Sequence, residues 1–280
     1  MSDTPTTRYR LAALDMDGTL LNSDHETSPF TRQALMRAAQ AGKVIALCTG
    51  RCLSELWSHF DENPGVAYAI SENGGCLYDV RAGRALSQLA IDADVAVQIL
   101  EIISQYDACT QVFADGQSYI QRMGEAALAP YHVADFAPVF DAGSKLAPDV
   151  LALARSGRRV EKIDVYFARP DDKAAFWKRI AGFGLFVADS LGYGCEISPP
   201  EATKAEGLKR LCALLDIPVS DAMGVGDGGN DVDLVRAAGL GVAMGNACEA
   251  VRAAAAVQTA DNDHDGAARA VLRYMLGEDV

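Results

Sequence analysis

The hydrophobic and polar positions at the start of the chain predict a β-α-β unit. An apolar run at residues 10–16, which ends in a polar turn, is typical of a buried strand. Ser28 followed by Pro29 marks a helix N-terminus, and the helical pattern continues to residue 41. A second apolar run at residues 44–48 predicts the next strand. This order of elements predicts parallel strands joined by a crossover helix.

The same alternation continues and returns at the end of the chain. A helix is expected near residues 53–60 and a strand near residues 68–70. Further along, the pattern predicts in order a helix from Lys204, a strand at 222–226, a helix from Asn230 and a strand at 241–243. The predicted fold class is therefore α/β, with a Rossmann-like doubly wound parallel sheet as its core.

The middle of the chain has a different pattern. Asp115 and Gly116 form a hairpin signal between two strand-like pieces, and residues 162–167 alternate before a helix that opens at Pro170. These features predict an antiparallel sheet with helices. We therefore expect an inserted α+β domain at residues 83–198. The core domain would then consist of residues 1–82 and 199–280.

The composition is that of a soluble globular chain, because 50% of the 280 residues are hydrophobic and 22% are charged. A formal net charge of -13 argues against a nucleic-acid or anionic-membrane partner. The cysteines are odd in number and none has CxxC spacing, which favours a reducing cytoplasm. Residues 1–10 carry no secretory apolar run, and no stretch approaches the roughly 18 apolar residues of a membrane span.

Acidic residues follow the predicted parallel strands at their carboxyl ends, where ligands of open α/β sheets bind. Asp15 and Asp17 are two positions apart, and in an extended chain such side chains point to the same side. The ends of the other strands add Thr49, Asp227, Asn230 and Asp231. Four carboxylates in one crevice repel one another unless their pKa values rise or a cation neutralises them. Hard oxygen ligands favour Mg²⁺ as that cation.

A glycine pattern near the end of the chain allows another interpretation. Gly224, Gly226 and Gly229 form a GxGxxG sequence between a strand and a helix, which is the fingerprint of dinucleotide-binding sites. The pattern falls late in the chain, and the next strand ends without the expected acidic residue. A lone glycine match is a weak motif, so a dinucleotide-binding dehydrogenase is disfavoured.

Four motifs in order resemble those of the haloacid dehalogenase (HAD) superfamily of phosphohydrolases. They are the DMDGT sequence that starts at Asp15, the Thr49-Gly50-Arg51 triplet, Lys204, and the GDGGND sequence of residues 226–231. Segments 71–75, 243–247 and 261–266 further resemble the Cof-type subfamily, which carries a type IIB cap. The long gap between the second and third motifs agrees with an inserted cap domain.

The resemblance implies roles for the motif residues. Asp15 would be the nucleophile that forms an aspartyl-phosphate, and Asp17 would be the general acid and base. The implied Mg²⁺ ligands are Asp15, Asp17 and Asp227, with Asp231 in the outer shell. The implied phosphate-binding groups are the backbone N–H groups of Met16 and Gly50 and the side chains of Thr49, Lys204 and Asn230.

The sequence thus predicts a Mg²⁺-dependent phosphomonoesterase that hydrolyses a small phosphorylated metabolite, such as a sugar phosphate or a phosphorylated cofactor. The inserted domain would select the substrate. A phosphomutase or phosphotransferase of the same fold is an alternative, because the aspartyl-phosphate can pass to a second hydroxyl. A phosphate-sensing module without turnover is another. The partner is a small-molecule phosphate ester, and the sequence leaves open whether the protein is a monomer or a homodimer.

Overall fold

A computed structural model of the chain describes residues 8–190 and 192–280. Residues 1–7, which belong to the N-terminal stretch where we expect no secretory segment, lie outside this range. The chain divides into two compact units. Unit 1 comprises Met1–Gly50, Ser58–Ser87 and Thr203–Val280, and unit 2 comprises Arg51–Trp57 and Gln88–Ala202.

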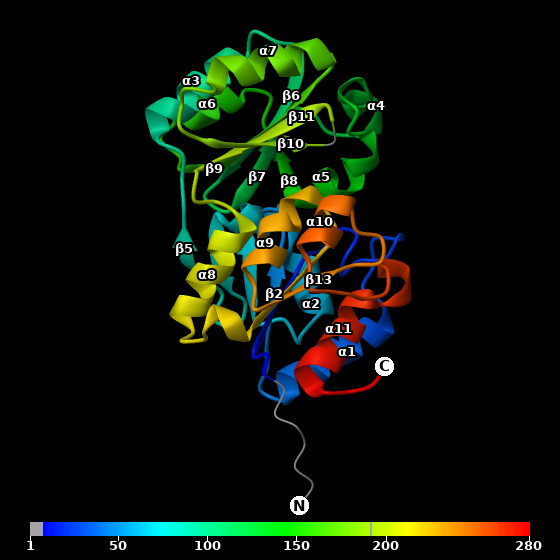
Figure 1. Ribbon diagram of the computed structural model, residues 1–280. Coiled ribbons are helices and arrows are strands. Elements are labelled where there is room, and N and C mark those ends of the chain that lie inside the picture. Colours follow the sequence, from blue (N-terminus) through cyan, green and yellow to red (C-terminus); the bar gives the residue numbers. More distant parts are fainter. Residues whose placement is uncertain (1–7, 191) are drawn as a thin grey trace, which may run out of the picture. The chain divides into compact units, whose positions relative to one another are not determined.

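Unit 1 is built on a mixed sheet whose strands run in the order β14-β13-β12-β1-β2-β3-β4-β5 (Figure 1). The strands are β1 (Leu11–Leu14), β2 (Val44–Cys48), β3 (Tyr68–Ser71), β4 (Cys76–Asp79), β5 (Arg84–Gln88), β12 (Ala222–Gly226), β13 (Leu240–Ala243) and β14 (Val257–Gln258). The strands from β14 to β3 pair in parallel, as predicted, whereas β4 pairs antiparallel with β3. The predicted α/β class is confirmed, with an antiparallel extension that the apolar pattern did not reveal.

Helices lie on both faces of this sheet. They are α1 (Pro29–Gln40), α2 (Trp57–Glu62), α8 (Lys204–Leu214), α9 (Val232–Ala237), α10 (Glu249–Ala254) and α11 (Gly266–Leu276). Helices α8 and α9 bury their apolar side chains against β1 to β4. Helices α1 and α11 pack on each other, on the other side of the sheet from α8 (Figure 1).

Local signals explain where the first helix begins and ends. The Ser28 side chain accepts a hydrogen bond from the Thr31 amide at 3.0 Å, and Pro29 occupies the first helical position. Gly42 follows the helix with φ of 77°, a conformation that favours glycine. The helix expected near residues 53–60 is present but begins later, because the chain first forms the 3₁₀ turn η1 (Leu53–Glu55) and then starts α2 at Trp57.

Unit 2 contains a sheet in the order β10-β11-β9-β6-β7-β8. Its strands are β6 (Ala108–Ala114), β7 (Gln117–Ile120), β8 (Ser144–Leu146), β9 (Val160–Phe167), β10 (Phe186–Ser190) and β11 (Gly194–Ser198). The pairs are antiparallel except for β7 with β8. Asp115 and Gly116 form the tight turn between β6 and β7 and have positive φ values of 54° and 73°.

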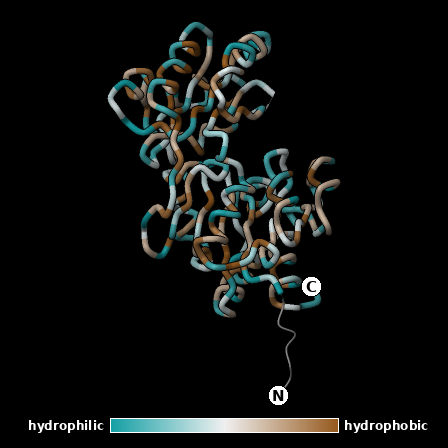
Figure 2. The backbone as a smooth tube through the Cα atoms, turned by 60° about the vertical axis from the view of Figure 1, so that its left-hand side comes forward, coloured by the Kyte–Doolittle hydropathy of each residue, from teal (hydrophilic) through white to brown (hydrophobic). Residues whose placement is uncertain are grey.

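The two faces of the unit 2 sheet differ. Helices α3 (Ala93–Ile103), α6 (Val150–Arg155) and α7 (Pro170–Ile180) cover one face with an apolar core. On the other face, α4 (Glu125–Leu128) and α5 (Ala137–Gly143) cover a smaller apolar cluster. That face also carries buried charged side chains, among them Lys162 and Asp164 of β9. In Figure 2, hydrophobic and hydrophilic stretches alternate along the chain in both units.

The boundaries of unit 2 differ from the residues 83–198 that the sequence indicates. Residues 84–87 stay in unit 1 because β5 joins the unit 1 sheet beside β4. The return to unit 1 falls between Ala202 and Thr203. Unit 2 also includes Arg51–Trp57, a segment that is distant in sequence from the rest of the unit. This membership depends on long-range contacts, which no local pattern reveals.

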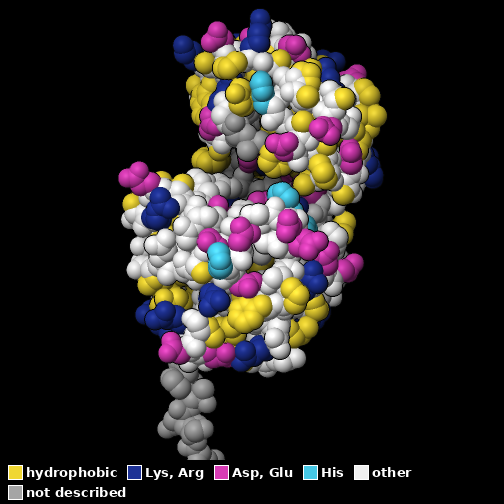
Figure 3. Space-filling model, turned by 90° about the vertical axis from the view of Figure 1, so that its right-hand side faces the viewer, with side chains coloured by type: hydrophobic (Ala, Val, Ile, Leu, Met, Phe, Trp, Pro, Cys, Tyr) yellow, Lys and Arg dark blue, Asp and Glu magenta, His cyan; other side chains and the backbone are white. Residues whose placement is uncertain are grey.

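Within the described ranges, no helix has the length and apolar character needed to cross a membrane. On the face of the molecule in Figure 3, basic side chains are scattered among acidic ones and do not gather in one patch.

The cysteines carry a testable prediction. All seven are free thiols; Cys248 is exposed, and the other six are buried. Burial raises the pKa of Cys212 to about 11 and that of Cys195 to about 12, so these thiols react slowly near neutral pH.

We therefore expect iodoacetamide to label the folded protein at Cys248, and to label all seven cysteines in urea. Peptide mass mapping checks the result, and the Cys248→Ser variant is the control that should remain unlabelled when folded. Rapid labelling of a second cysteine in the folded protein would contradict this packing.

Candidate active site

The site begins with Asp15, which directly follows β1 and is only 7% exposed. Lys204 is the first residue of α8, whose N-terminus is capped by the Thr203 side chain. The Lys204 ammonium lies 2.5 Å from Asp15 Oδ1 and 2.6 Å from Asp231 Oδ1, and all three side chains are buried. The structure therefore joins residues from the first, third and fourth motifs in one ion-pair network.

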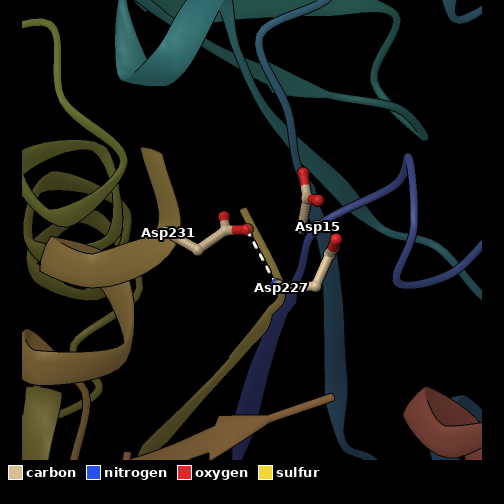
Figure 4. Close-up of side chains that lie close together, drawn as sticks. All are labelled: Asp15, Asp227 and Asp231. Atoms are coloured by element: carbon tan, nitrogen blue, oxygen red, sulfur yellow. Dashed lines mark hydrogen bonds between the residues drawn. The ribbon is translucent and has the colours of Figure 1, made fainter. Parts of the chain in front are cut away.

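Asp231 also shapes the loop after β12. Its Oδ2 accepts hydrogen bonds from the Asp227 amide at 3.0 Å and from the Gly228 amide at 2.9 Å. The bond to Asp227 is the dashed line in Figure 4. Asp227 Oδ1 in turn accepts a hydrogen bond from the Thr19 hydroxyl at 2.7 Å. Both carboxylates are thus held in place by their neighbours in unit 1.

Asp15, Asp227 and Asp231 form a group that fits a metal ion. Each offers one carboxylate oxygen, and these oxygens lie within 4.8 Å of one another (Figure 4). Burial and then the charge of Asp231 raise the pKa of Asp15 well above its usual value, against the opposing effect of Lys204. Burial chiefly raises the pKa of Asp227. Burial is thus the largest cause of both shifts, and the neighbouring carboxylates add to it. An all-oxygen donor set of this kind suits Mg²⁺.

Asp17 does not lie as the sequence argument expected. The predicted strand at residues 10–16 ends early, because β1 stops at Leu14 and the Met16 carbonyl accepts hydrogen bonds from three amides of a tight turn. Asp15 and Asp17 are therefore not neighbours on one face of an extended strand. Asp15 is buried, whereas Asp17 is exposed and is not among the three clustered carboxylates. Its charge nevertheless contributes to the raised pKa of Asp227.

Gly18 allows this turn to approach the loop after β12. Its φ is 79°, and a Cβ atom there would lie 2.5 Å from Asp227 Oδ2. A side chain at this position would both strain the backbone and displace the Asp227 carboxylate. The glycine of the DMDGT motif is therefore required for the contact between Thr19 and Asp227.

Thr49 and Asn230 are connected through Asn73. Thr49 follows β2 and is buried, and its carbonyl accepts a hydrogen bond from the Asn73 amide at 2.9 Å. Asn230 is exposed, and its side-chain amide donates to Asn73 Oδ1 at 3.2 Å. A Cβ atom on Gly50 would lie 3.2 Å from the same Asn73 oxygen. The structure thus brings together three of the residues expected to bind phosphate.

Sequence reasoning assigned no role to Thr19, Asn73 or Asn246, yet all three contact the site. Asn246 donates to the Gly18 carbonyl at 2.8 Å and lies 3.5 Å from Asp227 Oδ2. Each falls inside a segment that carried the family resemblance, namely DMDGT, residues 71–75 and residues 243–247. Their positions in those segments were the only sign in the sequence of a role at the site. The contact that each side chain makes depends on the fold.

The family is established by comparison. Residues 12–271 match the profile of a family described as haloacid dehalogenase-like hydrolases. The chain is 31% identical over 286 residues to a phosphatase, YwpJ, of Bacillus subtilis (strain 168), with 95% of this chain and 100% of that protein covered. The chain therefore belongs to the haloacid dehalogenase-like hydrolases, which confirms the predicted family.

A second relative and two solved structures add detail. The chain is 26% identical over 275 residues to the pyridoxal phosphate phosphatase YbhA of Escherichia coli (strain K12), with 95% of this chain and 99% of that protein covered. A haloacid dehalogenase-like hydrolase of B. subtilis aligns with a TM-score of 0.84 at 29% identity over 94% of this chain and 98% of that one. A subclass IIB sugar phosphatase, 22% identical, shares the fold with a TM-score of 0.80 over 95% of this chain and 99% of that one. The protein is thus an enzyme of the HAD phosphatase class with a subclass IIB fold.

Proposed function

We propose that this protein is a Mg²⁺-dependent phosphomonoesterase that works through an aspartyl-phosphate on Asp15. The observation that carries the proposal is the buried Asp15 carboxylate, which lies against Lys204 and beside the carboxylates of Asp227 and Asp231. A carboxylate held by a cation at the carboxyl end of a central strand is suited to attack an incoming phosphoryl group.

In this mechanism Asp15 attacks phosphorus and the alcohol leaves, after which water hydrolyses the aspartyl-phosphate. Asp17 protonates the leaving alkoxide and later takes a proton from the attacking water. Its exposure is compatible with a group that must meet both the leaving group and water. The pairing of Asp15 with Lys204 restrains the nucleophile and partly offsets its charge.

The metal would be held by Asp15, the backbone carbonyl of Asp17, and Asp227, with Asp231 orienting the loop from the outer shell. When bound, Mg²⁺ neutralises the carboxylates and the phosphate oxygens, which lets two anions approach each other. Thr19 and Asn246 keep the Asp227 carboxylate in place for this purpose.

The transferring phosphoryl oxygens would be bound by two kinds of group. The backbone N–H groups of Met16 and Gly50 supply directed hydrogen bonds, as do the Thr49 hydroxyl and the Asn230 amide. The Lys204 ammonium supplies positive charge where negative charge is spread in the transition state.

We propose that the substrate is a small phosphorylated metabolite, such as a sugar phosphate or a phosphorylated cofactor. A relative named for pyridoxal phosphate, aligned over nearly its whole length, supports this size and class of molecule. We also propose that unit 2 selects the organic part of the ester, because the residues assigned to phosphate chemistry all belong to unit 1.

The test is phosphate release from a panel of sugar phosphates, pyridoxal phosphate and para-nitrophenyl phosphate, with Mg²⁺ or with chelator. We expect release that requires Mg²⁺ and liberates inorganic phosphate together with the alcohol in equal amounts. Isomerised phosphate esters in place of inorganic phosphate would identify a mutase. Calorimetric binding of the esters without any product would identify a sensing module.

A further inference from the structure

A strained turn of unit 1 lies directly after β3. This turn is η2 (Glu72–Gly74). Glu72 and Asn73 have φ values of 55° and 53°, so two successive residues with side chains occupy the left-handed region. Such a conformation costs free energy and persists only where the surrounding structure holds it. The contacts of η2 therefore indicate what the turn does.

The backbone of η2 is held from two sides, both in unit 1. The Asn73 amide donates to the carbonyl of Thr49, directly after β2, at 2.9 Å. Gly74 has φ of 99°, and a Cβ atom there would clash with the carbonyl of Thr203, the N-cap residue of α8. The Arg210 guanidinium of α8 also donates to the Gly74 carbonyl. The turn is thus fixed between the end of β2 and the start of α8.

The side chain of Asn73 is fixed as well. It is 5% exposed, and a Cβ atom on Gly50 would lie 3.2 Å from its Oδ1 and 3.5 Å from its Nδ2. The absence of a side chain at Gly50 therefore lets the Asn73 amide pack against the backbone of that residue. Close packing of this kind leaves the amide little freedom to rotate. Its oxygen accordingly keeps one direction.

That oxygen accepts a hydrogen bond from Asn230. The Asn230 Nδ2 atom donates to Asn73 Oδ1 at 3.2 Å. Asn230 is exposed, so without this bond its side chain would sample several rotamers. A side-chain amide nitrogen carries two hydrogens, and one of those of Asn230 is committed to Asn73. The other then has a defined direction in which it can donate to a phosphoryl oxygen.

We propose that Asn73 is a positioning residue: by holding the side-chain amide of Asn230, it directs one N–H of that amide at the phosphate. The inference rests on the proposed function, in which Asn230 binds the phosphoryl oxygens, and it adds a residue to which that mechanism gives no role. An amide that is held in advance loses less conformational entropy when phosphate binds, so the affinity for phosphate is higher. The strained backbone of η2 serves to place this side chain.

The test removes the Asn73 side chain in two ways. Asn73→Gly suits the left-handed backbone, because glycine adopts positive φ without strain, whereas Asn73→Ala retains the strain. The matched control is Asp216→Gly, which changes an exposed residue of unit 1 with φ of 53°. The primary measurement is the dissociation constant of inorganic phosphate in the presence of Mg²⁺, by calorimetry, because it requires no turnover.

We expect both Asn73 variants to bind phosphate about tenfold more weakly than the wild type, a usual effect of losing a residue that orients a ligating group. The Asp216→Gly control should match the wild type. Similar losses in the glycine and alanine variants would assign the effect to the side chain and not to backbone strain. The affinity for Mg²⁺ without phosphate should stay unchanged, because the proposal gives Asn73 no part in metal binding.

A double-mutant cycle with Asn230→Ala distinguishes positioning from general structural damage. Asn230→Ala should itself weaken phosphate binding by about tenfold, because it removes a hydrogen bond to phosphate. In that background Asn73→Gly should have no further effect, since the side chain that it orients is gone. A purely structural defect would instead multiply with the loss from Asn230→Ala.

Unchanged phosphate affinity in Asn73→Gly, with the variant folded by circular dichroism, would overturn the proposal. Losses that multiply in the double variant would also overturn it, since Asn73 would then act independently of Asn230. Failure of the proposed function is a separate result, in which the wild type binds phosphate but releases none from any ester of the panel.

Discussion

Replacing Asp15 with asparagine is expected to abolish phosphate release while leaving the protein folded. The amide keeps the shape of the side chain but cannot form the aspartyl-phosphate, so we expect kcat to fall by roughly 10⁴-fold or more, as for other enzymes that lose a covalent nucleophile. The amide oxygen can still accept a hydrogen bond from the Lys204 ammonium, as Asp15 Oδ1 does. Lys204 retains Asp231 as an ion-pair partner.

Phosphate release from para-nitrophenyl phosphate in the presence of Mg²⁺ measures the effect, with thermal unfolding as the test of folding. The matched control is Asp24→Asn, which changes an exposed carboxylate soon after the DMDGT motif and should keep full activity. An Asp15→Asn variant with more than a few per cent of wild-type activity would show that the reaction does not pass through Asp15.

Replacing Lys162 with methionine is expected to destabilise unit 2 by about 3–5 kcal/mol, the usual cost when one partner of a buried ion pair is removed. The Lys162 ammonium is 2% exposed and lies 3.0 Å from Asp164 Oδ2 and 2.8 Å from Glu196 Oε2. Burial alone would lower the pKa of Lys162, but the two carboxylates outweigh it and raise that pKa. Methionine keeps the volume and removes the charge that both carboxylates need.

The destabilisation caused by Lys162→Met should depend on pH. Burial raises the pKa of Asp164 well above its usual value even with Lys162 beside it, and removal of the lysine raises that pKa further. A carboxyl group whose pKa is higher in the folded than in the unfolded state stabilises the fold when protonated, and this contribution is lost as pH rises. The deficit of Lys162→Met relative to the wild type should therefore be smaller at pH 5 than at pH 8.

Urea unfolding followed by tryptophan fluorescence measures this change, because both tryptophans, Trp57 and Trp177, lie in unit 2. The control is Arg155→Met, which removes an exposed arginine of unit 2 paired with Glu101 at 2.6 Å and should cost at most about 1 kcal/mol. A Lys162→Met variant as stable as this control at pH 8 would mean that the Asp164 and Glu196 carboxylates do not depend on the lysine.

Much of unit 1 could be predicted because its signals are local. The strand at 44–48 and the strand at 222–226 were predicted with the bounds that β2 and β12 have in the structure. Uninterrupted apolar runs predict buried parallel strands, and polar residues directly after them must lie at one edge of the sheet. For this reason Asp15 and Asp227 could be placed near each other from the sequence alone.

Strand β4, which pairs antiparallel with β3, and its neighbour β5 were not predicted, and neither was the place of residues 51–57 in unit 2. Strand β5 is partly exposed and has no clear apolar pattern, so its sequence does not predict a strand. The strand conformation depends on its pairing with β4. The membership of η1 depends on Gln111 and Gly143, which are far from Glu55 along the chain. No periodicity within a short window carries such information.

The sequence by itself determined the α/β class and the family, and it supplied the proposed set of acidic and phosphate-binding residues, because these depend on short apolar runs and on motifs of fixed spacing. The tertiary structure alone decided that Lys204 lies between Asp15 and Asp231, that Asp17 leaves the buried cluster, and that Glu55 holds η1 on unit 2. Each of these features depends on how segments that are distant in sequence pack together. Such packing minimises the free energy of the whole chain and not that of any one segment.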